Sequence, residues 1–444
     1  MRPITTLALV TTLFTSAPTF GQFLVREDYF TPTGLTNDGL IAGYLDQGGS
    51  FMIWDPDNST TEDIGGLAPG NGVGGQVYFS NDGQRLAGTS AGPEGAELSS
   101  YDRGTGEWTA HGGLGSVIDG TVGGGWSISG DGGTVVGLSW GDTTENIPVH
   151  AHAVAYNAEE GIMDLGTLYA GRSTRANAVS GDGSVVVGWQ DFNGPWKAAV
   201  WRKNPGGSYF PNNYILIDPK GDPNDEFNQL GECSAISYDG TWIGGYGDYA
   251  NDDEPWIWSE ATGVVNLGSL PLTGRGFVSG MSSDGSIVVG WFDGELFGDP
   301  RTPFIWTAED GLQDVNTFVP DPAGHHIYTV NTISPDGRYI TGYGVGEDGF
   351  SPFAYRLDLD FVGGLDERNG TQGINAYPNP VLDAITFTCP TTAELTICSM
   401  DGAEVYRSRV NGNVSLDLSY LATGVYSMVL RTEGSLRTQK IIKR

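Results

Sequence analysis

Short apolar runs alternate along most of the chain with turns rich in Gly, Asp and Asn. One pattern recurs seven times: Ser or Thr, any residue, Asp, Gly, and another Gly after a short apolar run. The copies lie 44 to 57 residues apart, and an aromatic residue closes the apolar run that follows each one. Repetition at two anchors indicates a repeat protein. The aspartates are Asp38, Asp82, Asp131, Asp182, Asp239, Asp284 and Asp336, and the aromatic residues are Trp54, Tyr101, Tyr156, Trp201, Trp258, Trp306 and Tyr355.

Each repeat predicts four short strands, which we name A to D in chain order. In the fourth copy, Val179 leads into Asp182–Gly183, and Val185–Val187 returns. An Asp-Gly pair between two such runs favours a hairpin with a two-residue type I′ turn, because both central residues need positive φ. The run closed by the aromatic residue supplies strand C, and a short turn leads to strand D.

Four-stranded repeats of this length are typical of propeller blades, whereas β-helix coils are far shorter. We therefore predict an all-β protein with a seven-bladed β-propeller over residues 22–362. Phe23–Arg26 precedes the first complete repeat, and the last repeat has no convincing strand D after Tyr355. Because a propeller must close its ring or expose a sheet edge, we expect Phe23–Arg26 to pair beside Pro352–Leu357.

Loop lengths distinguish the two edges of the predicted ring. The A–B and most C–D links are short, whereas the B–C and D–A links are long, as in Tyr246–Glu254 and Phe292–Thr302. In a four-stranded meander the long links emerge together at one edge, which we call the loop edge, and the short links at the other, the turn edge. Binding and catalytic residues concentrate on loops of rigid scaffolds, so the loop edge is the candidate functional surface.

Five aromatic residues lie where strand B reaches the loop edge, just after the second motif Gly. Flat rings at such an edge suit a bound sugar polymer, so they are the candidate ligand-binding residues. The alternative is that they pack between blades, where burial of each ring contributes about 2–3 kcal/mol. The five residues are Tyr44, Trp189, Tyr246, Trp291 and Tyr343.

The chain is strongly acidic, with a formal net charge of −32. Residues 374–444 carry +1 and Arg2 another +1, which leaves −34 on the predicted propeller region. Such a surface repels polyphosphate, so nucleic-acid binding is not expected. Solubility in salty surroundings explains the charge without a specific function. Loop carboxylates such as Asp252, Asp253 and Glu254 are the candidate acid and base of an enzymatic alternative.

Candidate metal ligands are few. His150 and His152 share a strand face, but no third ligand stands near them. His325–His326 is a candidate base in a D–A link, or a solvated surface. Stretches beginning at Asp55 and Asp222 alternate oxygen ligands but lack the Gly and distal Glu of a calcium loop. We expect no cofactor, with a structural calcium ion left open, and we expect the motif aspartates to cap their turns.

The repeats carry a recognisable core. Ser-x-Asp-Gly-x-x-Val-Val-Gly-Trp stands at Ser180–Trp189 and Ser282–Trp291, and His152–Ala153–Val154 is a variant of a His-Ala-Phe triplet. On these residues the stretch from Gln22 to Phe361 resembles the HAF family of extracellular repeats. Most repeats depart from the triplet. The resemblance implies a fold rather than an activity.

Residues 1–21 combine one positive charge, a short apolar stretch and small residues. This is typical of a secretory signal peptide, and no later stretch predicts a transmembrane helix. The three cysteines form no disulfide framework. Cys233 stands alone at the start of a strand A. Cys389 and Cys398 are expected on neighbouring strands, where simple hairpin pairing puts them on opposite faces and disfavours a bond.

A polar, Gly-bearing linker over residues 363–373 precedes a C-terminal segment. Three motifs follow in order: Tyr-Pro-Asn-Pro, Leu-x-x-Gly-x-Tyr and a basic tail. On these motifs residues 374–444 resemble the type A C-terminal sorting domain of the type IX secretion system of Bacteroidetes-type bacteria. The resemblance implies a small Ig-like β-sandwich, recognition by the outer-membrane translocon, and a secreted or cell-surface protein. The motif residues are Tyr377, Pro378, Asn379, Pro380, Gly424, Tyr426, Lys440 and Lys443.

The sequence favours an exported, non-enzymatic propeller that binds an extracellular polymer, such as a glycan, or a surface partner through its loop edge. One alternative is a polysaccharide lyase or glycoside hydrolase with its active site on the same edge. Another is a passive surface or adhesin module. The fold alone does not separate these functions, because propellers host many of them.

Overall fold

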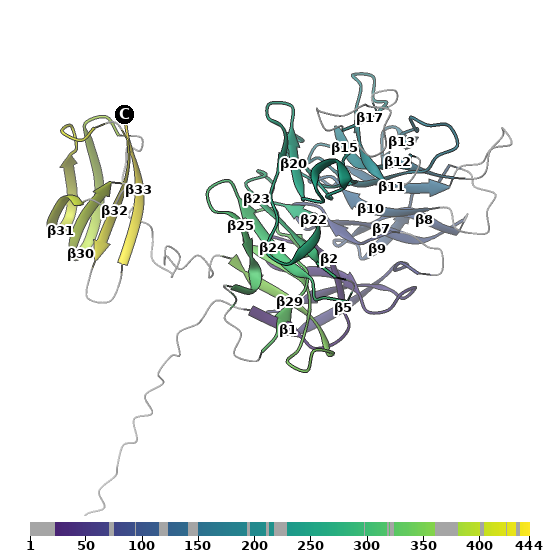
Figure 1. Ribbon diagram of the computed structural model, residues 1–444, viewed down its shortest axis with the longest axis horizontal. Helices are drawn as coiled ribbons and strands as arrows, with labels where there is room; N and C mark the ends of the chain where they lie inside the picture. The colour runs from purple at the N-terminus through teal and green to yellow at the C-terminus, as the bar shows by residue number, and fades with distance from the viewer. Residues whose placement is uncertain are drawn as a thin grey trace, which may run out of the picture. The chain divides into compact units, whose positions relative to one another are not determined.

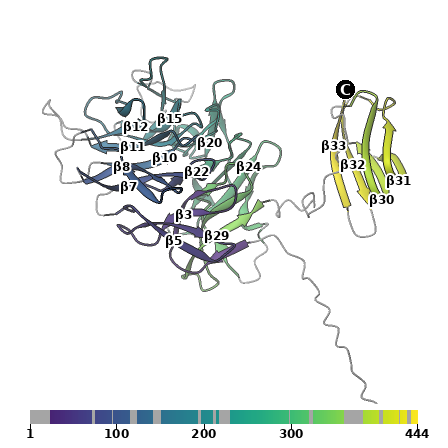
Figure 2. The same ribbon diagram turned by 180° about the vertical axis from the view of Figure 1, so that it is seen from behind.

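The computed structural model describes residues 23–70, 75–93, 95–114, 123–140, 150–192, 196–209, 213–216, 229–296, 298–317, 319, 324–359, 381–399, 404–422, 424–431 and 436–444. The chain divides into two compact units, Met1–Leu359 and Asp360–Arg444. Figure 1 and Figure 2 show the strands from opposite sides. Within the described ranges, no helix is long and apolar enough to span a membrane. The predicted signal peptide and linker lie outside these ranges.

The described residues of the first unit form seven antiparallel sheets. Six of them consist of four strands that follow one another in the chain, as the repeats predict. Two short 3₁₀ helices, η2 (Tyr249–Asn251) and η3 (Val315–Thr317), lie in the links. The strands of the six sheets are β2 (Thr31–Leu35), β3 (Ile41–Tyr44), β4 (Phe51–Asp55) and β5 (Thr60–Gly65); β6 (Tyr78–Phe79), β7 (Arg85–Gly92), β8 (Gly95–Asp102) and β9 (Glu107–Ala110); β10 (Gly123–Ile128), β11 (Thr134–Trp140), β12 (Ala151–Asn157) and β13 (Gly161–Asp164); β14 (Thr174–Val179), β15 (Val185–Gln190), β16 (Lys197–Arg202) and β17 (Tyr214–Ile215); β18 (Cys233–Ile236), β19 (Ile243–Gly245), β20 (Trp256–Ser259) and β21 (Gly263–Asn266); β22 (Thr273–Met281), β23 (Ile287–Gly294), β24 (Thr302–Thr307) and β25 (Gly311–Asp314).

The seventh sheet joins the two ends of the unit. The strand β1 (Phe23–Arg26) forms its outer edge and pairs antiparallel with β29, Phe23 opposite Leu357 and Arg26 opposite Ala354. The predicted pairing of the N-terminal segment beside the last aromatic strand is confirmed, and the edge of β29 is covered. The other strands of this sheet are β26 (His326–Ile327), β27 (Thr332–Ile333), β28 (Tyr339–Val345) and β29 (Pro352–Asp358).

The sheets follow one another around a common centre (Figure 1). Strand A of each sheet contacts strand A of the next, in the order β2, β6, β10, β14, β18, β22 and β27, and β27 contacts β2 again. Apolar clusters fill the space between consecutive sheets. One of them combines Val136 of β11 with Val186 of β15. The A strands of the seven sheets therefore surround one shared central space.

The serine and aspartate of the motif hold its turn. In the fourth sheet the Ser180 hydroxyl donates to Asp182 at 2.9 Å and accepts from the Val185 amide at 3.0 Å. Asp182 also accepts from the Ser184 amide, so it caps its own turn as predicted. The predicted two-residue type I′ turn is wrong. The Gly183 amide donates to the Ser180 carbonyl, and within this turn only Gly183 has positive φ, +73°. The bond from serine to the amide five residues on requires a wider loop, a type I turn followed by a left-handed glycine.

Main-chain hydrogen bonds between motif turns tie neighbouring sheets together at the turn edge. The Asn81 amide donates to the Gly130 carbonyl at 3.0 Å, and the Gly181 amide donates to the Tyr238 carbonyl at 2.7 Å. Similar bonds join the remaining turns of consecutive sheets from the third to the seventh. The Asp336 amide then donates to the side chain of a first-sheet residue at 2.9 Å. The variable residues between Ser and Asp of the motif thus surround the central space at its turn edge and line it there.

The second motif glycine is required by the close approach of strand A. A Cβ at Gly188 would fall on the Arg175 carbonyl of β14, and one at Gly290 would fall on the Phe277 carbonyl of β22. Each carbonyl belongs to a paired strand, so it cannot move aside without disturbing the sheet. The repeated pattern therefore reflects packing between strands A and B as well as turn formation.

The described residues of the second unit form one four-stranded antiparallel sheet in the order β31, β30, β32, β33. Cys389 and Cys398 both lie on β30, not on neighbouring strands as predicted, because pairing resumes after a register shift between Cys389 and Ala393. Cys389 is a free, buried thiol. The predicted Tyr377–Pro380 stretch lies outside the described residues. The strands are β30 (Ala384–Ser399), β31 (Glu404–Asp417), β32 (Gly424–Arg431) and β33 (Leu436–Lys443).

Candidate functional site

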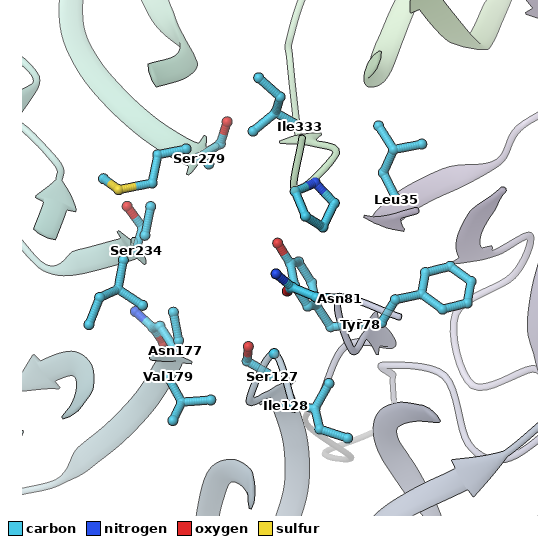
Figure 3. Close-up of a pocket in the computed structure, with 18 of the residues that line it drawn as sticks. Leu35, Tyr78, Asn81, Ser127, Ile128, Asn177, Val179, Ser234, Ser279 and Ile333 are labelled. Atoms are coloured by element: carbon cyan, nitrogen blue, oxygen red, sulfur yellow. The ribbon is translucent and has the colours of Figure 1, made fainter. Parts of the chain in front are cut away.

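The central space is ringed by a collar of seven residues, each from a strand A or from the one or two residues before it. In five sheets the collar residue is the extra residue of a β-bulge in strand A, which aims its side chain inward. Figure 3 shows Asn177, Ser234 and Ser279 arranged around this space. The collar residues are Thr33, Gln76, Trp126, Asn177, Ser234, Ser279 and Asn331.

Collar side chains bind the next sheet around the ring. The Ser234 hydroxyl donates to the Val278 carbonyl at 2.5 Å, and the Ser279 hydroxyl donates to a carbonyl of the seventh sheet at 2.5 Å. The same kind of bond starts from Thr33 and from Asn331, whose amide reaches a carbonyl of the first sheet. These bonds satisfy inward-facing donors and fix the spacing of the sheets.

The collar separates two cavities. The inner one has a volume of about 120 Å³, and its lining includes Tyr78, Ile128 and the motif-turn residue Tyr238, so it lies toward the turn edge (Figure 3). The outer one has a volume of about 280 Å³ and is lined by residues at the loop-edge ends of strands A and B. We call the outer cavity the loop-edge pocket. Its volume is near the lower end of the range for small-ligand sites.

Three of the five predicted ligand-binding residues line the loop-edge pocket: Tyr246, Trp291 and Tyr343. They come from three consecutive sheets. Tyr246 meets Phe277 edge-on, and Phe277 stacks on Trp291 with ring centroids 5.5 Å apart. Burial, reinforced by the charge of Glu232, raises the pKa of Tyr246, so its hydroxyl stays protonated and able to donate. Phe277, which does not itself line the pocket, thus joins Tyr246 to Trp291 behind its wall.

The other two predicted residues, Tyr44 and Trp189, lie behind the pocket. Burial raises the pKa of Tyr44, and Thr31, the lining residue opposite it on β2, opposes this shift. Trp189 is 6% exposed and stacks on Trp196 with centroids 4.5 Å apart. Its ring centroid is 5.3 Å from the guanidinium carbon of Arg175, another lining residue. Both residues therefore support the lining rather than form it.

Arg175 lines the pocket, and the sequence pattern did not indicate it. Its guanidinium carbon lies 3.9 Å from the ring centroid of Trp126, which also lines the pocket. Arg175 pairs with Glu232 at 3.2 Å and donates from Nε to Asn177 at 2.7 Å. Burial lowers the pKa of Arg175 and raises that of Glu232, and their mutual attraction opposes both shifts. The guanidinium is thus held in one orientation by an aromatic face and a carboxylate.

Arg301 is a second lining arginine, from the link between β23 and β24. Its Nε donates to Asp293 at 3.0 Å, and its Nη1 donates to the Tyr343 hydroxyl at 2.7 Å. The guanidinium carbon lies 5.8 Å from the ring centroid of Trp291. Arg301 therefore connects two of the predicted aromatic residues, although its own sequence context resembles an ordinary solvated loop.

The lining of the loop-edge pocket is rich in hydrogen-bond donors. It contains two guanidinium groups and two indoles, and none of its lining residues carries a carboxylate. The indole N–H groups of Trp126 and Trp291 are buried and have no acceptor among the described residues. The whole chain carries 54 Asp and Glu against 22 Lys and Arg, so the lining runs against the overall composition. Such a lining suits a ligand rich in acceptor oxygens.

Most of the exposed large apolar side chains lie in the links of the loop edge. Ten large apolar residues are exposed among those described, and seven of them lie in B–C or D–A links. Among the described residues of the first unit, the loop edge thus carries more exposed large apolar side chains than the turn edge. The seven are Tyr29, Leu168, Trp196, Tyr249, Leu272, Leu296 and Phe350.

The candidate catalytic residues do not line either cavity. Asp252 and Asp253 follow η2 with φ of +57° and +60°, and Asp253 pairs with Arg275 at 3.2 Å. Burial, and then the charge of Asp252, raises the pKa of Glu254. His325–His326, the other candidate base, is also absent from both linings. These candidate residues thus lie in the links of the loop edge, outside both cavities.

The candidate metal ligands come together only in part. His150 and His152 meet through Nε2 atoms 2.7 Å apart, and His152 is also hydrogen-bonded to Asp164 at 2.8 Å. Asp57 of the first calcium-like stretch is engaged in an ion pair with an arginine. The stretch beginning at Asp222 lies outside the described residues. Within the described ranges, no three or more His, Cys, Asp or Glu side chains are arranged to hold a metal ion.

Residues 375–444 match the secretion system C-terminal sorting domain family. The match indicates export through the type IX secretion system to the cell surface or the surroundings. Among the predicted sorting residues, Gly424 pairs with Lys443 and Lys440 pairs with Ser427 across β32 and β33. Tyr426 is buried, and its hydroxyl donates to a carbonyl at 2.9 Å.

Solved structures similar to this chain include TolB from Acinetobacter baumannii, at 16% identity and a TM-score of 0.36, covering 59% of this chain and 57% of that one. Oligogalacturonate lyase from Vibrio parahaemolyticus matches at 14% and 0.46, covering 76% and 91%. Virginiamycin B lyase from Staphylococcus aureus matches at 12% and 0.42, covering 76% and 98%. The search of curated proteins found no match. Likenesses at this level carry no information on ligand or activity, and the resemblance to HAF repeats stays a prediction.

Proposed function

We propose that this protein is an exported seven-bladed β-propeller that binds an extracellular polymer at its loop-edge pocket. In this proposal residues 1–21 are a signal peptide, 22–362 the propeller, 363–373 a linker and 374–444 the sorting domain, with an Ig-like sandwich. The closed order of seven sheets and the sorting-domain match support it. The observation that carries it is the gathering of Tyr246, Trp291 and Tyr343 around one cavity of about 280 Å³.

An extended ligand is favoured over an isolated small molecule because the loop edge carries exposed aromatic side chains outside the pocket lining. Trp196 is 48% exposed and Phe350 is 88% exposed, and both stand in links of the loop edge. A single residue of a polymer would occupy the pocket, and its neighbours would lie across these links. Aromatic faces suit this role, since they cover the apolar face of a sugar ring without a hydrogen-bond requirement.

A binding role is favoured over glycoside hydrolysis by the chemistry of the lining. Hydrolysis of a glycosidic bond usually needs two carboxyl groups about 5–10 Å apart on either side of the bond. The lining of the loop-edge pocket supplies arginines, indoles and hydroxyl groups but no carboxyl group. The enzymatic alternative predicts release of reducing ends or of unsaturated products, and the passive alternative predicts no polymer binding.

The test is a polysaccharide array probed with the full-length chain, followed by titration of the polymer that binds. Trp291→Ala should weaken binding about tenfold or more, because stacking of one ring contributes about 1–3 kcal/mol. Tyr420→Ala is the matched control, because Tyr420 is 58% exposed but belongs to the second unit. Unfolding midpoints check that both variants fold. Equal affinities of the two variants, or no binding to any polymer, would contradict the proposal.

A further inference from the structure

The loop-edge pocket concentrates positive side chains within a negatively charged protein. Arg175 of the fourth sheet and Arg301 of the sixth line it together with Tyr246 of the intervening fifth sheet. No lining residue is acidic, although the formal net charge of the chain is −32. Guanidinium groups bind planar or tetrahedral oxyanions through paired N–H groups. The lining therefore complements a ligand that carries an anionic group.

Both guanidinium groups are oriented by carboxylates that are not part of the lining. Glu232 binds Arg175 at 3.2 Å, and Asp293 binds Arg301 at 3.0 Å. Among the described residues, no acceptor is bonded to Nη1 of Arg175 or to Nη2 of Arg301. Each guanidinium group is thus held in one orientation by its carboxylate partner. One of its amino groups remains available to a further acceptor.

We infer that the loop-edge pocket binds an acidic sugar, with Arg175 and Arg301 receiving its carboxylate or sulfate group. This inference rests on the proposed function and adds the chemical class of the ligand. A neutral sugar would desolvate the free amino groups without supplying a charged partner, so the pocket discriminates against it.

Glu232 and Asp293 offset part of the charge of the arginines with which they pair, whereas the acidic loops farther away oppose this binding only at long range. At about 0.15 M salt the screening length is about 8 Å, so charges farther than this from the bound group contribute little. The arginines are in direct contact with the ligand and are partly shielded from solvent, so their attraction persists. The surface charge therefore slows the approach of an acidic polymer more than it weakens the bound state.

The test is isothermal titration of the full-length chain, at about 0.15 M salt, with two pairs of polymers. Alginate is compared with its neutral propylene glycol ester, and dextran sulfate with dextran. At least one acidic polymer should bind about tenfold or more tightly than its neutral form. The pair that shows the preference identifies carboxylate or sulfate as the recognised group.

Arg301→Gln should reduce that preference about tenfold, and Arg301→Lys should restore part of it. Arg338→Gln is the matched control. Arg338 also pairs with an aspartate, Asp358 at 2.8 Å, and lies 4.6 Å from the ring of Tyr339, but it lines neither cavity. Unfolding midpoints verify that the variants fold.

Three results would overturn the inference. These are equal affinity for acidic and neutral forms, equal loss in the Arg301→Gln and Arg338→Gln variants, and binding to neutral polymers alone. In each of these cases the proposed function still holds if Trp291→Ala weakens polymer binding. Binding to none of the four polymers overturns the acidic-sugar inference, and the wider array then decides the proposed function separately.

Discussion

Arg356 of β29 and Asp57 of the turn after β4 form a two-pronged ion pair that joins the seventh sheet to the first. Nη2 of Arg356 lies 2.6 Å from one Asp57 oxygen, and Nη1 lies 2.9 Å from the other. Nη1 also donates to the Gly39 carbonyl at 3.2 Å. The Arg356 side chain is 2% exposed. The last and first sheets are therefore held by this pair in addition to the contacts between their inner strands.

Removal of the Asp57 charge should destabilise the first unit. Asp57→Asn leaves the buried guanidinium of Arg356 without its anionic partner, and a loss of about 1–3 kcal/mol is expected because Asp57 is itself half exposed. Urea unfolding measures it. The control is Glu260→Gln, which breaks a pair with Arg202 at 3.9 Å in which the Glu260 side chain is 80% exposed. Equal midpoints for the two variants would contradict a role for Asp57 in joining the sheets.

Deletion of β1 should destabilise the whole first unit cooperatively. The strand pairs with β29 over four residues, so its loss exposes the edge of β29 and opens the link between the ends of the unit. A chain without residues 22–28 is expected to melt several degrees lower in one transition. A chain without residues 2–21 is the control and should melt like the full chain. If the first deletion leaves the melting temperature unchanged, β1 does not stabilise the ring.

The motif serine should matter more than a neighbouring serine that binds the same aspartate. Ser282 donates to Asp284 at 2.6 Å and also accepts from the Ile287 amide at 3.0 Å, whereas Ser286 binds Asp284 on the exposed side of the turn. Ser282→Ala should cost about 1–3 kcal/mol, because it leaves a half-buried amide without its acceptor. Ser286→Ala should cost less than about 0.5 kcal/mol. Chemical unfolding of both variants decides between this expectation and an equal loss.

The lowered pKa values of three motif aspartates predict that the protein loses stability in acid. The motif-serine hydrogen bond is the main cause that lowers the pKa of Asp82, Asp239 and Asp284. A carboxyl group with a lower pKa in the folded state stabilises the fold above its unfolded pKa, and this contribution is lost as pH falls through the folded pKa. Asp284→Asn should therefore lower the urea midpoint at about pH 7 and lower it less at about pH 3. An equal difference at the two pH values would contradict this linkage.

The sequence predicted the repeat architecture because its signals are local. The Ser-x-Asp-Gly turn, the aromatic end of strand C and the pairing of Phe23–Arg26 each follow from neighbouring residues or from an unfilled sheet edge. The turn type was wrong because the Asp-Gly rule considers two residues, while the Ser180 hydroxyl binds an amide five residues on. The turn preference of an Asp-Gly pair could not predict this bond, because the bond joins residues outside that pair.

The pocket could be predicted only in part. Tyr246, Trp291 and Tyr343 share one position in the repeat, so the pattern indicated them together. The collar also shares a position in six sheets, the fifth residue before the motif aspartate, but its residue types range from Ser to Trp. Its inward direction depends on β-bulges that no residue type marks. Arg175 and Arg301 reach the pocket from a strand A and a B–C link, so only the closed order of the sheets brings them together.

Backbone hydrogen exchange of the full-length chain, with and without a bound polymer, tests most directly whether the loop edge is the binding face. Binding at the loop edge predicts slower exchange in residues 246–254, 291–296 and 343–350 and unchanged exchange in the motif turns at 180–185 and 282–287. It also predicts no change in residues 384–399 of the second unit. Protection of the motif turns, or protection confined to the second unit, would contradict binding at the loop edge.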